Sequence, residues 1–268
     1  MTEFKNSHLL NPLRVTKRGI FVIAHVVLCV FMLSLLRLRL GREWYLTRTG
    51  QNLAHWWMRH LTRMLGIRIY QHGSPPVQHA LYVGNHVSFL DILITLSVTQ
   101  LNFLSKNSVR YWPVVGFITS VAGTLFIKRS KRRRLASVID LISTALQQGR
   151  SVMVFPEGTT TLGREPAKFH SGLFQAAINS QSPVQAVAIR YLKDGQLDRD
   201  SAYIDNDNLL VSLYRIMRRP KTEAHLTFCQ PFKADGMNRT EMASKARQQI
   251  IDAFSQQLVS SPATLIEP

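Results

Sequence analysis

The sequence predicts an α/β protein in which a single layered domain, with helices flanking a mixed sheet, follows an N-terminal membrane-associated helical motif. Three observations support this prediction. From residue 67 onward, short β-rich runs alternate with helical patterns, as in sheets that are covered by helices. Residues 19–36 contain no Asp, Glu, Lys or Arg. Hydrophobic residues make up 46% of the 268 residues, which is enough for a sizeable core.

The apolar stretch at residues 19–36 is long enough to cross a membrane, because eighteen helical residues span about 27 Å. Arg37, Arg39 and Arg42 follow it in place of a small-residue cleavage site, so a secretory signal is disfavoured. Basic residues stand on both sides, so the positive-inside rule gives no orientation. The stretch therefore either spans the bilayer or enters one leaflet and returns to the same anionic surface.

A second helical pattern follows, in which apolar residues recur at spacings of three and four and therefore lie on one face. These residues are Leu53, Trp57, Leu61, Met64 and Leu65. Residues suited to a membrane interface stand beside them, namely Trp44, Tyr45, Trp56, Arg48, Arg59 and Arg63. We interpret the segment as an amphipathic helix in the membrane interface. The alternative is a helix packed on the soluble domain, and both can hold for different faces.

The remaining elements are predicted in alternation. The candidate strands lie at residues 80–83, 101–104, 124–127, 152–155, 184–189 and 225–229. A helix is expected between residues 131 and 148, with Gly149 as its C-terminal stop. A final helix is expected to begin near Asn238, with Glu241 completing a capping pair.

The chain is strongly basic, with 33 Lys and Arg against 16 Asp and Glu and a formal net charge of +17. This excess favours a polyanionic partner, either nucleic acid or anionic lipid headgroups. The basic run at residues 128–134 is accompanied by no nucleic-acid-binding motif, and the apolar N-terminus fits a lipid surface. We therefore expect membrane phospholipids, and no nucleic acid, as partners. Cys29 and Cys229 show no CxxC spacing or nearby histidine cluster, so neither a disulfide nor a metal site is expected.

A possible catalytic pair lies in the segment NHVSFLD at residues 85–91, directly after a predicted strand. Asp91 could accept the Nδ1 proton of His86 and leave Nε2 free as a base. Histidine ordinarily has a pKa of about 6.5, so it is suited to accepting a proton at neutral pH. Taken alone, this spacing also occurs by chance, and a structural histidine is the alternative.

The segment FPEGTT at residues 155–160 also follows a predicted strand. It offers Glu157, Gly158 and Thr159 at the carboxyl end of that strand, where open α/β sheets bind ligands. A third segment, GTLFIKR, ends in Lys128 and Arg129. An arginine at a strand exit can bind a phosphate through two hydrogen bonds; the alternative is a surface charge leading into the basic run.

These three segments, in their order along the chain, resemble the glycerolipid acyltransferase family typified by 1-acyl-sn-glycerol-3-phosphate acyltransferase. The blocks of that family read NHxxxxD, GxxFIxR and FPEGT, and all three are present. The resemblance covers about residues 67–232 and includes Lys106 before the second block and the segment KFHSG after the third. It implies an acyltransferase catalytic domain at residues 67–268 behind membrane-anchoring helices at residues 1–66.

The resemblance also implies roles for individual residues. His86 would be the general base and Asp91 its orienting partner. The substrate-binding residues would be Lys106, Arg129, Glu157, Gly158 and Thr159, with Arg129 on the acceptor phosphate and Glu157 and Gly158 at the acceptor glycerol. The chain departs from the family pattern at Gln185, where a proline is usual, and at Lys128, where an acidic residue is common.

The reaction implied is transfer of a fatty acyl group from acyl-CoA or acyl-carrier protein to the free hydroxyl of 1-acyl-glycerol-3-phosphate, giving phosphatidic acid in phospholipid biosynthesis. No Ser or Cys stands in a recognisable nucleophile setting, so direct transfer is expected. Neither a metal nor a bound cofactor is expected, since the thioester is a substrate. We expect the protein at the cytoplasmic face of the inner (plasma) membrane.

Two alternatives stay open. The same chemistry could act on another lysolipid such as lyso-ornithine lipid, which similar members of the family acylate. From a different class, a non-catalytic membrane lipid-binding protein could keep the same fold. The presence of both His86 and Asp91 argues against this second alternative.

Overall fold

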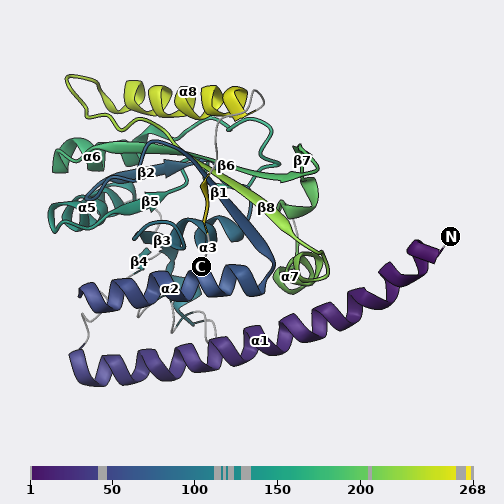
Figure 1. Cartoon of the computed structure of the whole chain (residues 1–268). Coiled ribbons are helices and arrows are strands. Elements are labelled where there is room, and N and C mark those ends of the chain that lie inside the picture. Colours follow the sequence, from purple (N-terminus) through teal and green to yellow (C-terminus); the bar gives the residue numbers. More distant parts are fainter. Residues whose placement is uncertain are drawn as a thin grey trace.

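The computed structural model describes residues 2–41, 47–111, 116, 119, 124–127, 134–204, 207–257 and 264–266. Across these residues, one sheet of nine strands is covered by helices on both faces (Figure 1). The strands follow the order β4-β3-β5-β2-β6-β8-β1-β9, and β7 pairs with β6. Parallel and antiparallel pairs both occur, so the predicted mixed sheet with flanking helices is confirmed.

The predicted strands correspond to β2, β3, β4, β5, β6 and β8, whereas β1, β7 and β9 are additional. The strands are β1 (Ile67–Gly73), β2 (Leu81–Gly84), β3 (Asn102–Lys106), β4 (Leu125–Ile127), β5 (Val152–Val154), β6 (Val184–Lys193), β7 (Gln196–Leu197), β8 (Thr222–Phe228) and β9 (Thr264–Leu265). The α-helices are α1 (Thr2–Leu40), α2 (Arg48–Met64), α3 (Leu90–Leu96), α5 (Arg134–Gln147), α6 (Gln175–Ser180), α7 (Leu209–Met217) and α8 (Arg239–Gln257).

The strand directions place several segment ends at one edge of the sheet. β2 is parallel to β5 and β6, and β3 is parallel to β4 and β5. These five strands therefore end at the same edge, which we call the carboxyl edge. β8 is antiparallel to β6 and parallel to β1, so β1 begins at this edge. Open α/β sheets bind their ligands at such an edge.

Apolar residues of the central strands fill two cores, one on each face of the sheet. Leu81 and Val83 pack with residues of α5, α6 and α8, whereas Tyr82 and Met153 pack with residues of α3 and α7. Every residue of β2 and β5 is buried. This pattern is typical of parallel strands whose two faces are both covered by helices.

Both predicted helix ends are confirmed. Asn238 Oδ1 accepts hydrogen bonds from the N–H groups of Thr240 (2.8 Å) and Glu241 (3.1 Å). Glu241 Oε2 in turn accepts from the Asn238 N–H at 2.8 Å, which completes the capping pair of α8. Gly149 follows α5 with a φ of +77°, and its N–H donates to the Leu146 carbonyl at 2.9 Å.

The apolar face of α2 is covered by protein rather than left for a membrane. Trp57 is 3% exposed and packs with Cys29 and Leu33 of α1. Leu65, just after the helix, is 2% exposed and belongs to the core beneath the sheet. For this face the structure favours the interpretation of a helix packed on the domain, because α1 and the sheet together supply its apolar environment.

The other face of α2 exposes an aromatic side chain. Trp56 is 48% exposed, as suits an aromatic residue at a membrane interface. Trp44 and Tyr45 lie outside the described residues, and so does the side chain of Arg48. The division of the chain at residue 66 stays a prediction, although α2 and β1 are joined directly by Leu65 and Gly66.

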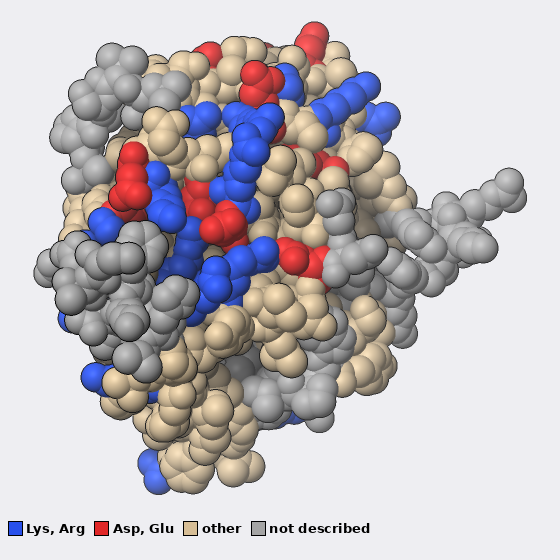
Figure 2. Space-filling model, turned by 90° about the vertical axis from the view of Figure 1, so that its right-hand side faces the viewer, with Lys and Arg blue, Asp and Glu red and all other residues tan. Residues whose placement is uncertain are grey.

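α1 carries a large exposed apolar surface. The segment Pro12–Arg39 is, by length and composition, long and apolar enough to cross a membrane. Apolar side chains that are at least half exposed include Ile20, Phe21, Ile23, Val27, Leu28 and Phe31. Figure 2 shows few charges on the lower part of the molecule, at the level of α1, and many Lys and Arg above it. α1 therefore fits a membrane-associated helix.

Arg18 fixes α1 to the domain. Its Nη1 donates to the carbonyl oxygens of Met217 at 2.8 Å and Arg219 at 2.6 Å, and its Nη2 to that of Pro220 at 2.9 Å. These carbonyls lie at the C-terminal end of α7, where the helix dipole favours a cation. Gly66 has a φ of +79°, and a Cβ there would lie 2.1 Å from Arg18 Nη2, so a larger residue would be strained and would displace the guanidinium.

The hydrogen bonds of the Gln185 side chain account for one departure from the family pattern. The side chain is fully buried, and Nε2 donates to the carbonyls of Pro75 at 3.1 Å and Cys229 at 3.0 Å. Its Oε1 accepts from the Val77 N–H at 3.0 Å. The glutamine thus ties the loop between β1 and β2 to the end of β8. A proline at this position could form none of these bonds.

Candidate active site

His86 and Glu157 are neighbours because β2 and β5 are paired in register. Val83 pairs with Val154 in the parallel ladder, and three residues further along each strand lead to His86 and Glu157. The His86 N–H donates to Glu157 Oε1 at 3.0 Å. The two segments that the sequence predicts at strand ends therefore meet at the carboxyl edge.

Asp91 lies in the first turn of α3 and faces the His86 ring. The distance between His86 Nδ1 and Asp91 Oδ2 is 2.8 Å. The Asp91 side chain is fully buried, whereas 20% of the His86 side chain is exposed. When Nδ1 donates to the carboxylate, Nε2 of the neutral ring is unprotonated. His86 is therefore placed to accept a proton from a molecule at the carboxyl edge.

Three further donors hold the Asp91 carboxylate. The N–H groups of Val87 and Ser88 donate to Oδ2 at 2.7 and 3.0 Å, and the Tyr191 hydroxyl donates to Oδ1 at 2.8 Å. Burial, and then the charge of Asp91, raise the pKa of Tyr191 well above its usual range, so the hydroxyl stays protonated. Such charge-assisted bonds fix the carboxylate in one orientation toward His86.

Asn85 and Phe155 fix the strand exit and the ring of His86. Asn85 is fully buried, and its side chain donates to the Ile189 carbonyl at 2.9 Å and accepts from the Ile189 N–H at 2.8 Å. The ring of Phe155 stacks on the His86 imidazole, with centroids 4.0 Å apart and planes 9° from parallel. The first and third sequence blocks thus contact each other through their side chains as well as their backbones.

Glu157 binds the backbone of the site. It is 5% exposed, its Oε1 accepts from the His86 N–H, and its Oε2 accepts from the Ala167 N–H at 3.2 Å. Burial raises the pKa of Glu157, while the hydrogen bonds from His86 and Ala167 oppose this rise. These contacts position the loop that carries His86. Contact between Glu157 and the acceptor glycerol stays a prediction.

Gly158 and Thr159 are exposed where the same loop reaches solvent. Gly158 has a φ of +74°, a conformation that glycine adopts without strain, and its N–H donates to the Phe155 carbonyl at 3.1 Å. Lys106 ends β3 at the carboxyl edge, and its side chain lies outside the described residues, as do Lys128 and Arg129. Substrate binding by these residues stays a prediction.

Cys29 and Cys229 are free thiols, the first in the contact between α1 and α2 and the second directly after β8. Burial raises the pKa of the Cys229 thiol to about 12, so it is protonated at neutral pH. Within the described part of the chain, no group of three or more His, Cys, Asp or Glu is arranged to hold a metal ion.

The contact between Tyr191 and Asp91 could not be predicted from the sequence. Tyr191 lies two residues beyond the predicted strand at residues 184–189, because β6 continues to Lys193. Tyr191 is 1% exposed although it carries a polar hydroxyl, and a buried tyrosine usually has a hydrogen-bond partner. The signal in the sequence is weak, since its partner Asp91 is 100 residues away along the chain.

Tyr191→Phe is expected to lower kcat by about ten- to hundredfold, the effect of one hydrogen bond to a charged group. Without the hydroxyl, the Asp91 carboxylate loses one of the donors that fix its orientation toward His86. The Michaelis constants of both substrates should therefore change much less than kcat. A kcat within about twofold of wild type in a folded Tyr191→Phe protein would show that this bond does not position His86 for catalysis.

Comparisons with known proteins agree with this geometry. Residues 67–190 match the family model described as Acyltransferase. The chain is 38% identical over 205 residues to a lyso-ornithine lipid O-acyltransferase from Pseudomonas aeruginosa, and the matched region covers 76% of this chain and 79% of that protein. It is 33% identical over 183 residues to a 1-acyl-sn-glycerol-3-phosphate acyltransferase from Neisseria meningitidis, covering 66% of this chain and 71% of the other.

The fold is also known from a crystal structure. The 1-acyl-sn-glycerophosphate acyltransferase PlsC from Thermotoga maritima superposes with a TM-score of 0.67 at 16% identity. The match covers 96% of this chain and 99% of that one, so it includes the N-terminal helices as well as the sheet. The chain therefore belongs to the acyltransferase family that contains the 1-acyl-sn-glycerol-3-phosphate and lyso-ornithine lipid acyltransferases.

Proposed function

We propose that this enzyme transfers a fatty acyl group from a thioester to the hydroxyl of a membrane lysolipid, with His86 as general base. The observation that carries this proposal is the contact of His86 Nδ1 with a buried carboxylate that is itself held by three other donors. Such an arrangement fixes the ring tautomer and leaves Nε2 as the proton acceptor. The alternative of a non-catalytic lipid-binding protein gives no reason for this arrangement.

The proposed reaction proceeds through a tetrahedral intermediate. His86 Nε2 takes the proton of the acceptor hydroxyl, and the oxygen attacks the carbonyl carbon of the thioester. When the tetrahedral intermediate collapses, the carbon–sulfur bond breaks and the thiolate receives the proton back from His86. The Asp91 carboxylate stabilises the imidazolium between these two steps. The ester forms directly, and no acyl-enzyme is required.

For the acceptor, we place lyso-ornithine lipid first. The chain is more similar, over more of its length, to the lyso-ornithine lipid O-acyltransferase of Pseudomonas aeruginosa than to the 1-acyl-sn-glycerol-3-phosphate acyltransferase of Neisseria meningitidis. The headgroup of lyso-ornithine lipid carries a carboxylate, which a positive pair such as Lys128 and Arg129 could bind. The second candidate is 1-acyl-glycerol-3-phosphate, which would give phosphatidic acid and whose phosphate also suits Lys128 and Arg129.

For the donor, we propose acyl-CoA or acyl-carrier protein as substrates, with no bound cofactor. Both thioesters are made in the cytoplasm, so we place the catalytic domain at the cytoplasmic face of the inner (plasma) membrane. The apolar face of α1 supports attachment to that membrane, where the lysolipid acceptor is found.

A competition assay tests the acceptor. Purified full-length protein in mixed micelles receives lyso-ornithine lipid and 1-acyl-glycerol-3-phosphate at equal concentrations with one acyl donor, and the products are identified by mass. We expect acylated ornithine lipid to exceed phosphatidic acid by about tenfold, which corresponds to about 1.4 kcal/mol of discrimination. The His86→Ala protein is the blank. An excess of phosphatidic acid would reverse the assignment, and no product from either acceptor would refute both.

A further inference from the structure

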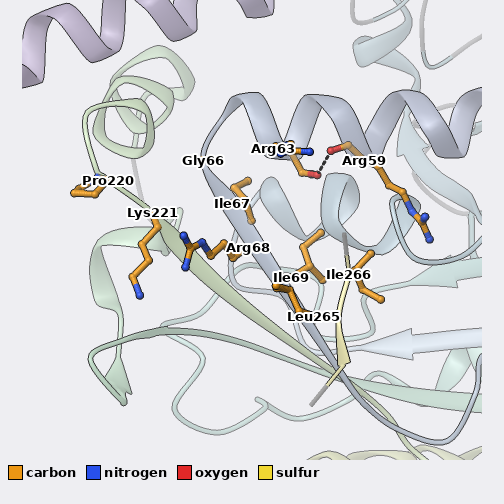
Figure 3. A pocket seen from close by; sticks show the side chains of 11 residues that line it. Arg59, Arg63, Gly66, Ile67, Arg68, Ile69, Pro220, Lys221, Leu265 and Ile266 are labelled. Atoms are coloured by element: carbon orange, nitrogen blue, oxygen red, sulfur yellow. Dashed lines mark hydrogen bonds between the residues drawn. The ribbon is translucent and has the colours of Figure 1, made fainter. Parts of the chain in front are cut away.

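A pocket of about 470 Å³ lies between the end of α2, the start of β1, the loop between α7 and β8, and β9 (Figure 3). We call it the α2–β1 pocket. Four of its lining residues are basic, namely Arg59, Arg63, Arg68 and Lys221, and none is acidic. Other parts of its wall are apolar and come from β1, from Leu265 of β9 and from Ile266 after it.

Two of these basic residues already have partners. Arg59 Nε donates to the Ser97 carbonyl at 2.9 Å, and Figure 3 shows its guanidinium directed away from the other basic residues. Lys221 Nζ pairs with Glu223 Oε1 at 2.5 Å. Arg63 and Arg68 are exposed, and neither forms an ion pair with a carboxylate among the described residues. They are the cations available to an anionic ligand.

The pocket lies at the level where α1 changes from polar to apolar. Gly66, one of its lining residues, is covered by the Arg18 guanidinium. Arg18 directly precedes the charge-free stretch at residues 19–36. A helix that enters a membrane places such a boundary among the lipid headgroups, where phosphate groups lie. The pocket is therefore at the depth of lipid phosphates when α1 enters the hydrocarbon.

The pocket and His86 share the carboxyl edge but are separate. In the strand register, the backbone of Arg68 in β1 lies opposite that of Glu223 in β8, which lies opposite that of Leu192 near the end of β6. In the strand order, β1 is the third strand from β2, so roughly 14 Å separates the two strands at a spacing of about 4.8 Å. A lipid in the pocket would lie on the membrane side of the molecule without occupying the site of acyl transfer.

We propose that the α2–β1 pocket binds the phosphate headgroup of an anionic membrane phospholipid, with Arg63 and Arg68 as the phosphate-binding residues. A guanidinium can donate two parallel hydrogen bonds to a phosphate. Phosphatidylcholine carries the same phosphate, but its cationic choline group would lie beside the two arginines and be repelled by them. The apolar wall contacts the glycerol and the first methylene groups of the lipid. Inorganic phosphate shares the headgroup chemistry but cannot use this wall.

The test measures lipid binding and does not use acyl transfer. Full-length protein in a neutral detergent receives matched amounts of phosphatidylglycerol and phosphatidylcholine, and bound lipid is counted by mass spectrometry of the intact protein. We expect one phosphatidylglycerol to bind in preference to phosphatidylcholine. Arg63→Gln with Arg68→Gln should weaken its binding by about tenfold. Because neither side chain is buried, the double variant should keep the melting temperature of the wild type.

A matched control separates the pocket from diffuse attraction. Arg37→Gln with Arg39→Gln removes the same charge from exposed positions at the far end of α1. We expect phosphatidylglycerol binding by this control to stay within about twofold of wild type, because exposed charges act weakly at a distance. Equal losses in the two double variants would overturn the pocket in favour of diffuse electrostatics. If millimolar inorganic phosphate displaces the lipid, the site is one for a soluble anion and the lipid assignment fails.

Discussion

His86→Ala is expected to lower kcat by about two to four orders of magnitude, the usual contribution of a general base. The acceptor hydroxyl would then lose its proton only to water, while the loops around residue 86 keep their shape. They do so because Glu157 binds the backbone N–H of residue 86, which alanine retains. The Michaelis constants should therefore change much less than kcat. The measurement is steady-state acyl transfer with a labelled thioester.

A matched histidine provides the control for this variant. His79 is exposed, adopts a φ of +57° and precedes β2, at the sheet edge opposite to His86. Asparagine tolerates this backbone conformation, so His79→Asn should keep turnover within about twofold of wild type. Wild-type turnover by a folded His86→Ala protein would refute the proposed mechanism, whatever the identity of the acceptor.

Asp91→Asn is expected to lower kcat by about three to four orders of magnitude, as for the aspartate of other imidazole–carboxylate pairs. The carboxylate accepts from the imidazole, from two backbone N–H groups and from Tyr191. An amide has only one acceptor oxygen, so one side of the group becomes a donor that faces another donor. The neutral amide also cannot stabilise the imidazolium. The similar shape of asparagine should keep the protein folded.

The double variant tests whether the two residues act as one unit. If Asp91 works only through His86, the protein with both His86→Ala and Asp91→Asn should be no slower than the slower single variant. Losses that multiply would mean that Asp91 acts independently, for example by holding the loop at Val87 and Ser88. A melting curve of each variant separates this structural effect from a loss of catalysis.

Much of the catalytic site could be predicted from local sequence. The segments with His86, Asp91 and Glu157 each follow a short β-rich run, so their places at strand ends follow from pattern alone. The cap at Asn238 and the stop at Gly149 are also local, because each involves residues within a few positions of one another. β1 was outside the predicted set because its apolar residues do not alternate regularly over its seven positions.

Other features depended on contacts between distant parts of the chain. The apolar face of α2 is suited equally to a membrane and to protein, and the pattern at Trp57 and Leu65 is the same in both cases. Only the placement of α1 and the sheet shows that protein covers this face. The same holds for Gln185, which departs from the family pattern but is explained by its bonds to two loops.

The class of fold, the apolar N-terminal segment and the segments that carry His86 and Asp91 could be predicted from the sequence. These features arise from periodicity and from residue types at short spacings, which do not depend on distant contacts. Only the folded structure shows that β2 and β5 are adjacent, that Tyr191 reaches Asp91, and that Arg63 and Arg68 line one pocket. Each of these depends on strand order and register, which are set by the packing of the whole sheet.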